Sequence, residues 1–196
     1  MSEKEAIEKG KKRMKDSKDP VHDYKHAENV AEHGFKILKS LKEEGWRTDT
    51  EIDENLIYLC AFWHDCYKAL FEKKTFLNEV FEGVNSAKIT ERELKPLLSE
   101  KRLNMVLHAI KNHNNLPYLL FSGKKMPILT RVLIEGDTID AKNLERKKKV
   151  CLCPRSFMHK ILVFFGEPVL SILQKIYIKS SYAKCQLSLM SNKKKL

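Results

Sequence analysis

The sequence predicts an all-α fold, a single-domain helical bundle, on three observations. Its 196 residues include only seven glycines and six prolines, the residues that interrupt helices, and 32% are charged. Apolar residues recur at the three- and four-residue spacing of a helix face in successive segments. No segment shows the strict alternation of a half-buried strand. A hydrophobic content of 42% over this length provides one sizeable core.

The first residues, 1–18, are polar and rich in lysine, and we expect a basic tail or a frayed helix there. Asp19 and Pro20 are a helix-start signal, because aspartate caps a first turn and proline is tolerated within it. The predicted helix runs to about Glu44, and Gly45 ends it. The apolar residues that define its buried face are Ala27, Val30, Ala31, Ile37, Leu38 and Leu41.

A second helix is predicted to begin near Asp53 and to include LIYLCAFWHDCYKALF, which is apolar nearly all round and should lie at the centre. Two shorter helices follow, with Ser86 and Ser99 as their expected caps. Pro127 begins the next helix. The residues expected on its inward face are Leu129, Val132, Leu133 and Gly136. The apolar stretch 157–182 indicates one or two further helices, broken at its GEP sequence.

These elements divide the chain into a basic N-terminal segment (1–18), a helical domain (19–150) and a C-terminal helical extension with a basic tail (151–196). The excess of 37 basic over 26 acidic residues, +11, indicates an anionic partner. Lysine runs such as ERKKK are more typical of a solvated helix face. Because no aromatic residues are interleaved with them, we favour attraction of an anionic small-molecule substrate over nucleic-acid binding.

The N-terminal sequence lacks the apolar stretch of a signal peptide, and five irregularly spaced cysteines suit a reducing compartment, so a cytoplasmic location is expected. The segment ILVFFGEPVLSILQKIYI is interrupted by Glu167, Pro168 and Lys175, so no membrane span is predicted. The C-terminal helices are expected to pack on the domain. A homodimer interface or contact with a membrane surface is the alternative.

Two polar residues, His64 and Asp65 of FWHDCYK, stand in the apolar centre of the second helix. Burying a carboxylate is costly unless something neutralises it, and a metal cation does so while also using the imidazole. Adjacent side chains on a helix point about 100° apart, close enough to reach one ion inside a bundle. A hydrogen-bonded His–Asp pair is the alternative.

Two other residues are expected to face the same core. His26 lies near the start of the first long helix's apolar face, and Asp137 follows Gly136, where a missing side chain allows close helix approach. Each alone is more often structural. Together with His64 and Asp65 they supply two nitrogens and two carboxylates, a set suited to a borderline or hard divalent cation.

In this order, and with the flanking sequences HDYKHAENV, HDCYK and EGDTIDA, these residues resemble the HD-domain metal-dependent phosphohydrolases over about residues 19–145. The resemblance implies an all-helical bundle. It also implies that the metal ligands are His26, His64, Asp65 and Asp137. It also places His22 at the edge of the site and Lys68 where it would meet a substrate phosphate. Many relatives have arginine in place of Asn29, so a phosphate contact from that position is in doubt.

Some relatives hold two metals through two additional histidines, for which the candidates are His108 and His113. Five residues at about 100° each place them about 140° apart on a straight helix, so both cannot face one site. His113 is in line with Val106 and Ile110, and His108 points away. We therefore expect one metal, with His113 as a nearby acid or phosphate contact and His108 exposed without a role. A site with two metals is the alternative.

The ligand set predicts a hydrolase. A divalent ion, whether manganese, magnesium, iron or nickel, lowers the pKa of its bound water and polarises the phosphoryl group that the water attacks. The expected catalytic residues are Asp65, Lys68 and His113. Asp140 would orient a ligand or lie on the helix surface. The predicted substrate is a nucleotide or related phosphate ester. The alternatives are an HD-fold protein that binds a nucleotide or nucleic acid without turnover, and a metal-dependent oxygenase.

Overall fold

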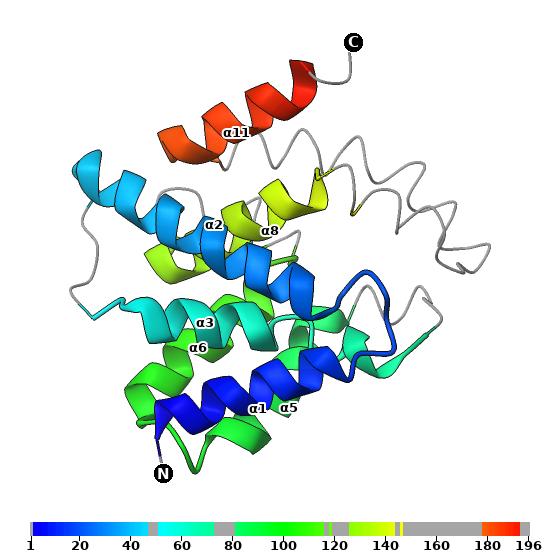
Figure 1. Cartoon of the computed structure of the whole chain (residues 1–196). Helices are drawn as coiled ribbons and strands as arrows, with labels where there is room; N and C mark the ends of the chain where they lie inside the picture. Colours follow the sequence, from blue (N-terminus) through cyan, green and yellow to red (C-terminus); the bar gives the residue numbers. More distant parts are fainter. Residues whose placement is uncertain are drawn as a thin grey trace.

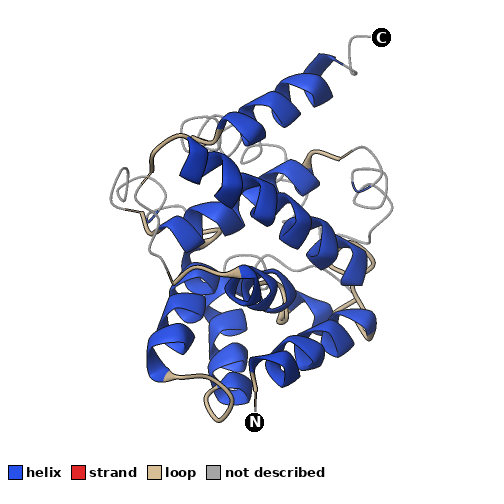
Figure 2. Cartoon of the chain, turned by 60° about the vertical axis from the view of Figure 1, so that its left-hand side comes forward, coloured by secondary structure: helices blue, strands red, loops and turns tan. Residues whose placement is uncertain are grey.

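The protein is a bundle of helices throughout the part of the chain that the structure describes (Figures 1 and 2). The computed structural model describes residues 2–46, 51–72, 81–115, 118, 126–143, 146 and 178–192. The helices there are α1 (Glu3–Lys15), α2 (Tyr24–Glu43), α3 (Glu54–Trp63), the 3-10 helix η1 (Lys68–Leu70), α5 (Glu82–Leu94), α6 (Glu100–Asn112), α8 (Ile128–Ala141) and α11 (Ser181–Asn192). The all-α prediction is confirmed. Helix α3 lies centrally, and α1 and α11 lie at opposite ends of the bundle.

The N-terminal segment is a packed helix, and the expectation of a tail is wrong. Helix α1 packs on α3 and buries four residues at helical spacing, which are Ala6, Ile7, Gly10 and Met14. The Trp63 indole nitrogen donates to the Ala6 carbonyl at 3.0 Å. The many lysines concealed this apolar face in the sequence because they occupy the remaining positions of the same helix.

Helix α2 begins later than predicted. Its cap is Asp23, whose side chain accepts a hydrogen bond from the backbone nitrogen of His26 at 2.9 Å. Asp19 instead accepts from the backbone nitrogen of Val21 at 2.8 Å, and its carboxylate is therefore used in the preceding turn. The predicted apolar face of α2 is buried, and Gly45 ends the helix with φ of 75°, in the left-handed region that favours glycine.

Helix α3 ends at Trp63, so His64 and Asp65 follow the helix, whereas the sequence had predicted them inside it. The Nδ1 atom of His64 donates to the Ala61 carbonyl at 2.8 Å. A continuing helix would offer that carbonyl to the backbone nitrogen of Asp65. The predicted start near Asp53 is confirmed, since α3 begins at Glu54, and the Asp53 side chain caps it by accepting from the backbone nitrogen of Leu56 at 3.0 Å.

The remaining helices begin close to the predicted positions, with one exception. Ser99 precedes α6 and Pro127 precedes α8, as expected. Ser86 is not a cap, since α5 begins at Glu82 and the buried Ser86 hydroxyl accepts from the backbone nitrogen of Tyr67 at 3.2 Å. The inward face predicted for α8 is confirmed as buried.

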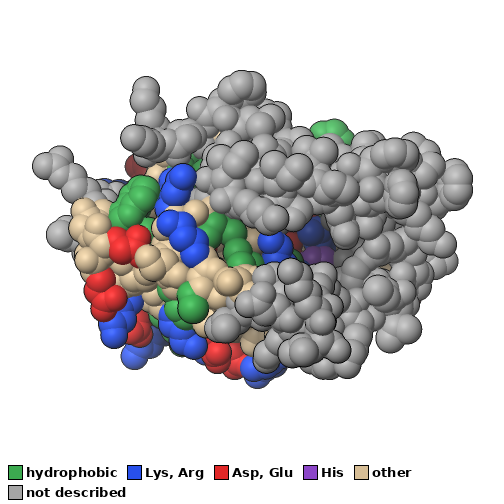
Figure 3. Space-filling model, turned by 90° about the horizontal axis from the view of Figure 1, so that it is seen from above, with side chains coloured by type: hydrophobic (Ala, Val, Ile, Leu, Met, Phe, Trp, Pro, Cys, Tyr) green, Lys and Arg blue, Asp and Glu red, His purple; other side chains and the backbone are tan. Residues whose placement is uncertain are grey.

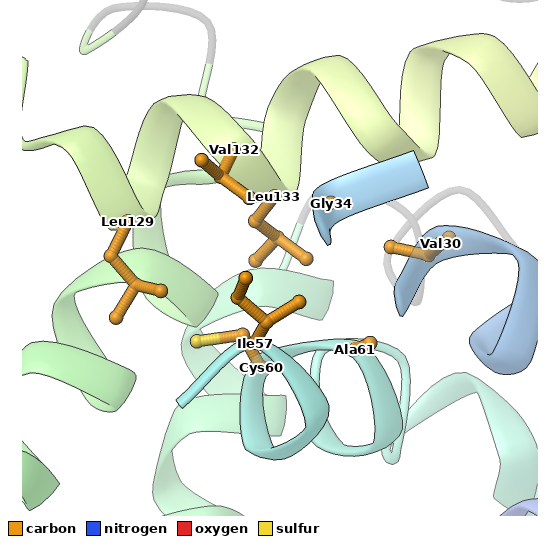
Figure 4. Close-up of a pocket in the computed structure, with 8 residues that line it drawn as sticks. All are labelled: Val30, Gly34, Ile57, Cys60, Ala61, Leu129, Val132 and Leu133. Atoms are coloured by element: carbon orange, nitrogen blue, oxygen red, sulfur yellow. The ribbon is translucent and has the colours of Figure 1, made fainter. Parts of the chain in front are cut away.

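Helices α2, α3 and α8 enclose the apolar centre of the bundle (Figure 4). The cavity between them has a volume of about 10 Å³, room for one water at most, so the contact is closely packed. Its lining residues are Val30, Gly34, Ile57, Cys60, Ala61, Leu129, Val132 and Leu133. A Cβ atom on Gly136 would lie 2.9 Å from the Val30 carbonyl oxygen, so the glycine permits this close approach of α8 to α2.

Helix α11 packs on α2 and α8, with Ala183 buried in the apolar core, and polar contacts at and before its first turn accompany this packing. The buried Glu135 carboxylate accepts from the Lys179 backbone nitrogen at 2.8 Å and from the Ser180 hydroxyl at 2.5 Å. His33 and the Tyr182 hydroxyl are hydrogen-bonded at 3.0 Å. Most of the stretch predicted as C-terminal helices, 157–177, lies outside the described residues.

The described helices include none with both the length and the apolar character needed to cross a membrane. The described surface is rich in charge. On the face seen from above, basic side chains lie next to a histidine (Figure 3).

Candidate metal centre

Four side chains from three distant segments of the chain lie close together in the bundle. The Nε2 atom of His26, in the first turn of α2, lies 3.2 Å from Nε2 of His64 and 3.0 Å from Oδ2 of Asp65. His64 Nε2 and Asp65 Oδ2 are 3.1 Å apart. Oδ1 of Asp137, on α8, lies 3.6 Å from His26 Nε2. The donor atoms of His26, His64 and Asp65 therefore cluster closely, and Asp137 adjoins them through His26; His26, His64 and Asp137 form a group whose ligand atoms all lie within 4.8 Å of one another.

These separations match those of ligand atoms around a single ion. Two ligand atoms at right angles, each about 2.1 Å from a cation, lie about 3.0 Å from each other. The distances among His26, His64 and Asp65 are 3.0, 3.1 and 3.2 Å. These three ligand atoms therefore fit one divalent cation.

Both histidines present an unprotonated nitrogen toward this centre when the imidazoles are neutral. His26 Nδ1 donates to Oδ2 of Asp140 at 2.7 Å, and His64 Nδ1 donates to the Ala61 carbonyl at 2.8 Å. Because the proton of each neutral ring is on Nδ1, two Nε2 lone pairs face each other at 3.2 Å. That arrangement requires a positive charge between them, either a proton on Nε2 or a metal cation.

The electrostatics of the centre agree with that requirement. Burial lowers the pKa of His26, but hydrogen bonds to Asp140 and Asp65 outweigh burial and leave the pKa raised. Burial lowers the pKa of His64, which favours the neutral ring. Burial opposes ionisation of Asp65, yet the neighbouring His64 and Lys68 hold the pKa of the Asp65 carboxyl well below its usual range. Neutral imidazole beside ionised carboxylates is the form that binds a cation.

The sequence model of the HD domain family matches residues 23–142, more than half of the chain. The chain belongs to the HD-domain family. This family binds divalent metals, and the match confirms the resemblance seen in the sequence. The HD-domain match extends from the cap of α2 to the end of α8 and leaves α1 and α11 outside it. Comparisons with curated proteins and with solved structures gave no match.

A second layer of contacts orients the predicted ligands of the HD domain. The Asp140 carboxylate accepts from His26 through Oδ2 and from Asn29 Nδ2 through Oδ1 at 2.7 Å. Asp140 therefore contacts a predicted ligand and is not a helix-surface residue. Arg146 Nη1 lies 3.2 Å from Oδ1 of Asp137 and 3.0 Å from Oδ2 of Asp140. Burial opposes ionisation of Asp137, but Arg146 and His26 hold its pKa far below the usual range.

Lys68 and His113 lie on the other side of the Asp65 carboxylate, where they share a buried glutamate. Lys68 Nζ is 3.6 Å from Asp65 Oδ1 and 2.9 Å from Glu82 Oε2, and His113 Nε2 is 3.3 Å from Glu82 Oε1. Burial raises the pKa of Glu82 to about 7. Burial opposes protonation of His113, but Glu82 raises the His113 pKa to about 9. Glu82 is the anion to which both basic groups are bound.

Of the two remaining histidines, His113 lies beside the centre and His108 lies away from it, as the sequence predicted. His113 follows the end of α6 with its ring centroid 5.1 Å from that of His64, and its Nδ1 donates to the Ile110 carbonyl at 2.7 Å. His108 is exposed and hydrogen-bonded to the Thr130 hydroxyl at 3.1 Å. In the described part of the chain, a second group with metal-ligand spacing contains His64, Asp65 and His113, and it shares His64 with the group of His26, His64 and Asp137.

His22 lies at the edge of the centre. Its Nδ1 is 2.7 Å from Asp19 Oδ2, and its Nε2 is 3.7 Å from Asp65 Oδ2. The resemblance placed His22 at the edge of the site, and these distances agree with that position.

Sequence reasoning missed two residues of this neighbourhood. Glu82 was overlooked because α5 was expected to begin near Ser86, which left Glu82 outside any helix face. Arg146 belongs to the ERKKK run, which was interpreted as a solvated face, although its side chain is only 10% exposed. The sequence did contain one signal for Arg146. It lies only nine residues after Asp137, a separation short enough for its side chain to reach that carboxylate.

Proposed function

We propose that the protein is a divalent-metal-dependent phosphohydrolase acting on a nucleotide or a related phosphate ester. The observation that carries the proposal is the cluster of His26 Nε2, His64 Nε2 and Asp65 Oδ2 within 3.0 to 3.2 Å of one another, with Asp137 Oδ1 3.6 Å from His26 Nε2. Membership of the HD-domain family supports it, since HD domains are typically metal-dependent phosphohydrolases.

Four side chains would hold one cation, namely His26, His64, Asp65 and Asp137. When bound, a divalent cation there supplies a water of lowered pKa and polarises a phosphoryl oxygen. Asp140 keeps the proton of His26 on Nδ1, so that Nε2 stays available as a ligand. The ligands come from three separate segments of the bundle, so their geometry is set before any substrate arrives.

The basic side chains beside the centre would bind and orient the substrate. Lys68, 12% exposed, lies close to Asp65 and can reach a phosphoryl oxygen, whose negative charge it would offset. The protonated His113 ring is bound to Glu82 and would donate a hydrogen bond or a proton on the same side. An anionic substrate also suits the net charge of +11.

The cellular setting is part of the proposal. The described cysteines, Cys60, Cys66 and Cys185, are free thiols, which supports a reducing, cytoplasmic location. Burial raises the pKa of the Cys60 thiol far above its usual range, so this cysteine is a filler of the core and no nucleophile.

The test is hydrolysis of a panel of nucleotides and phosphate esters by the purified protein, with manganese, magnesium, iron or nickel added after chelation. At least one substrate should release phosphate or nucleoside, and Asp65→Ala should abolish this activity. Asp16→Ala, which removes an exposed carboxylate after α1, is the matched control and should keep full activity. Unchanged turnover in Asp65→Ala would contradict the proposal. Tight nucleotide binding without hydrolysis under any metal would favour the non-catalytic alternative.

A further inference from the structure

We propose that Arg146 is an anion-binding residue of the centre and that the same guanidinium opposes binding of the metal cation. Removal of its charge should therefore change two affinities in opposite directions, tightening the binding of a divalent cation and weakening the binding of phosphate. The phosphate half rests on the proposed function, whereas the cation half depends only on the geometry of the centre.

The guanidinium competes for an oxygen that a cation would use. Nη1 of Arg146 lies 3.2 Å from Oδ1 of Asp137, the same oxygen that lies 3.6 Å from His26 Nε2 at the centre. A cation bound to this oxygen would face a positive charge only one contact away. Binding of the cation must weaken the Arg146–Asp137 contact, and that loss opposes it.

Arg146 has a second anchor that survives this loss. Nη1 also lies 3.0 Å from Oδ2 of Asp140, and Asp140 is fixed in turn by His26 and Asn29. The side chain is therefore held beside the centre when its contact with Asp137 weakens. When its contact with the Asp137 carboxylate weakens, the guanidinium can donate a hydrogen bond to a different oxygen beside the centre. The oxygens of a phosphate group match its planar set of donors.

The exposure of the ligands shows from which side an anion arrives. The side chains of His26, His64 and Asp65 are 1%, 0% and 2% exposed, whereas that of Asp137 is 30% exposed. Solvent thus reaches the centre on the side of Asp137, where Arg146 lies. A phosphoryl group that enters from there comes next to the guanidinium before it reaches the buried ligands.

A purely structural role for the Arg146 ion pair makes the contrary prediction. If the guanidinium only holds Asp137 and Asp140 in position, its removal disorders a ligand, and the affinities for cation and phosphate fall together. The sign of the change in cation affinity therefore separates the two roles.

The experiment uses the full chain and two probes, Mn²⁺ alone and inorganic phosphate added to the Mn²⁺-loaded protein. Calorimetric titration of Arg146→Gln should give a Kd for Mn²⁺ about tenfold lower than that of the wild type, and a Kd for phosphate at least about tenfold higher. Arg146→Lys, which keeps the charge, should give values between the two. Arg92→Gln removes the same charge from a side-chain position 75% exposed on α5 and should change neither Kd.

A measurement on the wild type removes any dependence on the folding of the variants. Modification of Arg146 by phenylglyoxal, followed by peptide mass spectrometry, should increase when Mn²⁺ is added and decrease when phosphate is then added. Parallel falls in both affinities, unchanged affinities, or modification that responds to neither probe would overturn the inference. Absence of divalent-cation binding in the wild type would overturn it together with the proposed function. Opposed shifts without hydrolysis would overturn the proposed function alone.

Discussion

A methyl group at Gly136 should force apart α2 and α8, the two helices that carry the predicted ligands His26 and Asp137. The Cβ atom of an alanine there would lie 2.9 Å from the Val30 carbonyl oxygen, 0.5 Å inside the 3.4 Å at which ordinary contact begins. Because the obstacle is the backbone of α2, no side-chain rotation relieves the overlap. Helices α2 and α8 must therefore separate by about 0.5 Å at this point.

The separation has two measurable consequences. Overpacking of a close helix contact costs about 1–3 kcal/mol of stability. The same shift would lengthen the His26–Asp140 hydrogen bond from 2.7 Å to about 3.2 Å, because these residues lie on α2 and α8 respectively. Loss of such an orienting contact to a histidine ligand typically lowers metal affinity by about 10- to 100-fold. Gly136→Ala should thus weaken both the fold and cation binding.

Urea unfolding and Mn²⁺ titration of Gly136→Ala test this reasoning, with Gly45→Ala as the control. Gly45 has φ of 75°, and a Cβ atom added there would meet no atom within 4 Å, so alanine strains only the backbone, by about 1 kcal/mol. Gly45 follows the end of α2 remote from His26, so this variant should lose stability and keep its cation affinity. Wild-type cation affinity in Gly136→Ala, or an equal loss in both variants, would refute the reasoning.

Three further outcomes are expected. Trp63→Phe removes the hydrogen bond to the Ala6 carbonyl and should cost about 1–2 kcal/mol in urea unfolding, whereas an unchanged midpoint would mean that α1 does not depend on this contact. Burial lowers the pKa of His33 below 6.5. The unfolded chain therefore takes up a proton on His33 at a higher pH than the folded chain does, and stability should be lost as pH falls below about 6.5 toward the folded-state pKa. In thermal melts across pH 5–8, His33→Asn should remove this pH dependence, and a profile identical to that of the wild type would contradict the expectation. A divalent cation at about 100 times its Kd should stabilise the folded wild type by about 2.7 kcal/mol. The Asp65→Asn variant should be stabilised far less, as measured by the shift of the melting temperature. Equal shifts would exclude Asp65 as a ligand.

Much of the fold was predictable because its signals are local. The apolar faces of α2 and α8 repeat at helical spacing, and the caps Asp53 and Pro127 adjoin the helices that they begin. The start of α2 was misplaced because Asp19 and Asp23 offer equivalent capping side chains. Local sequence does not state that the carboxylate of Asp19 is used by the turn before the helix.

The sequence by itself determined which side chains could form a cation site, because His26, His64, Asp65 and Asp137 are polar residues within apolar surroundings. Only the tertiary structure decided how they are held and which charges surround them. The end of α3 at Trp63 depends on where the His64 ring donates its proton. Glu82 is buried against Lys68, 14 residues away in the sequence, and Arg146 is buried against Asp137, nine residues away. A charged side chain is buried only where the fold brings an opposite charge to it, and that pairing is a property of three-dimensional proximity.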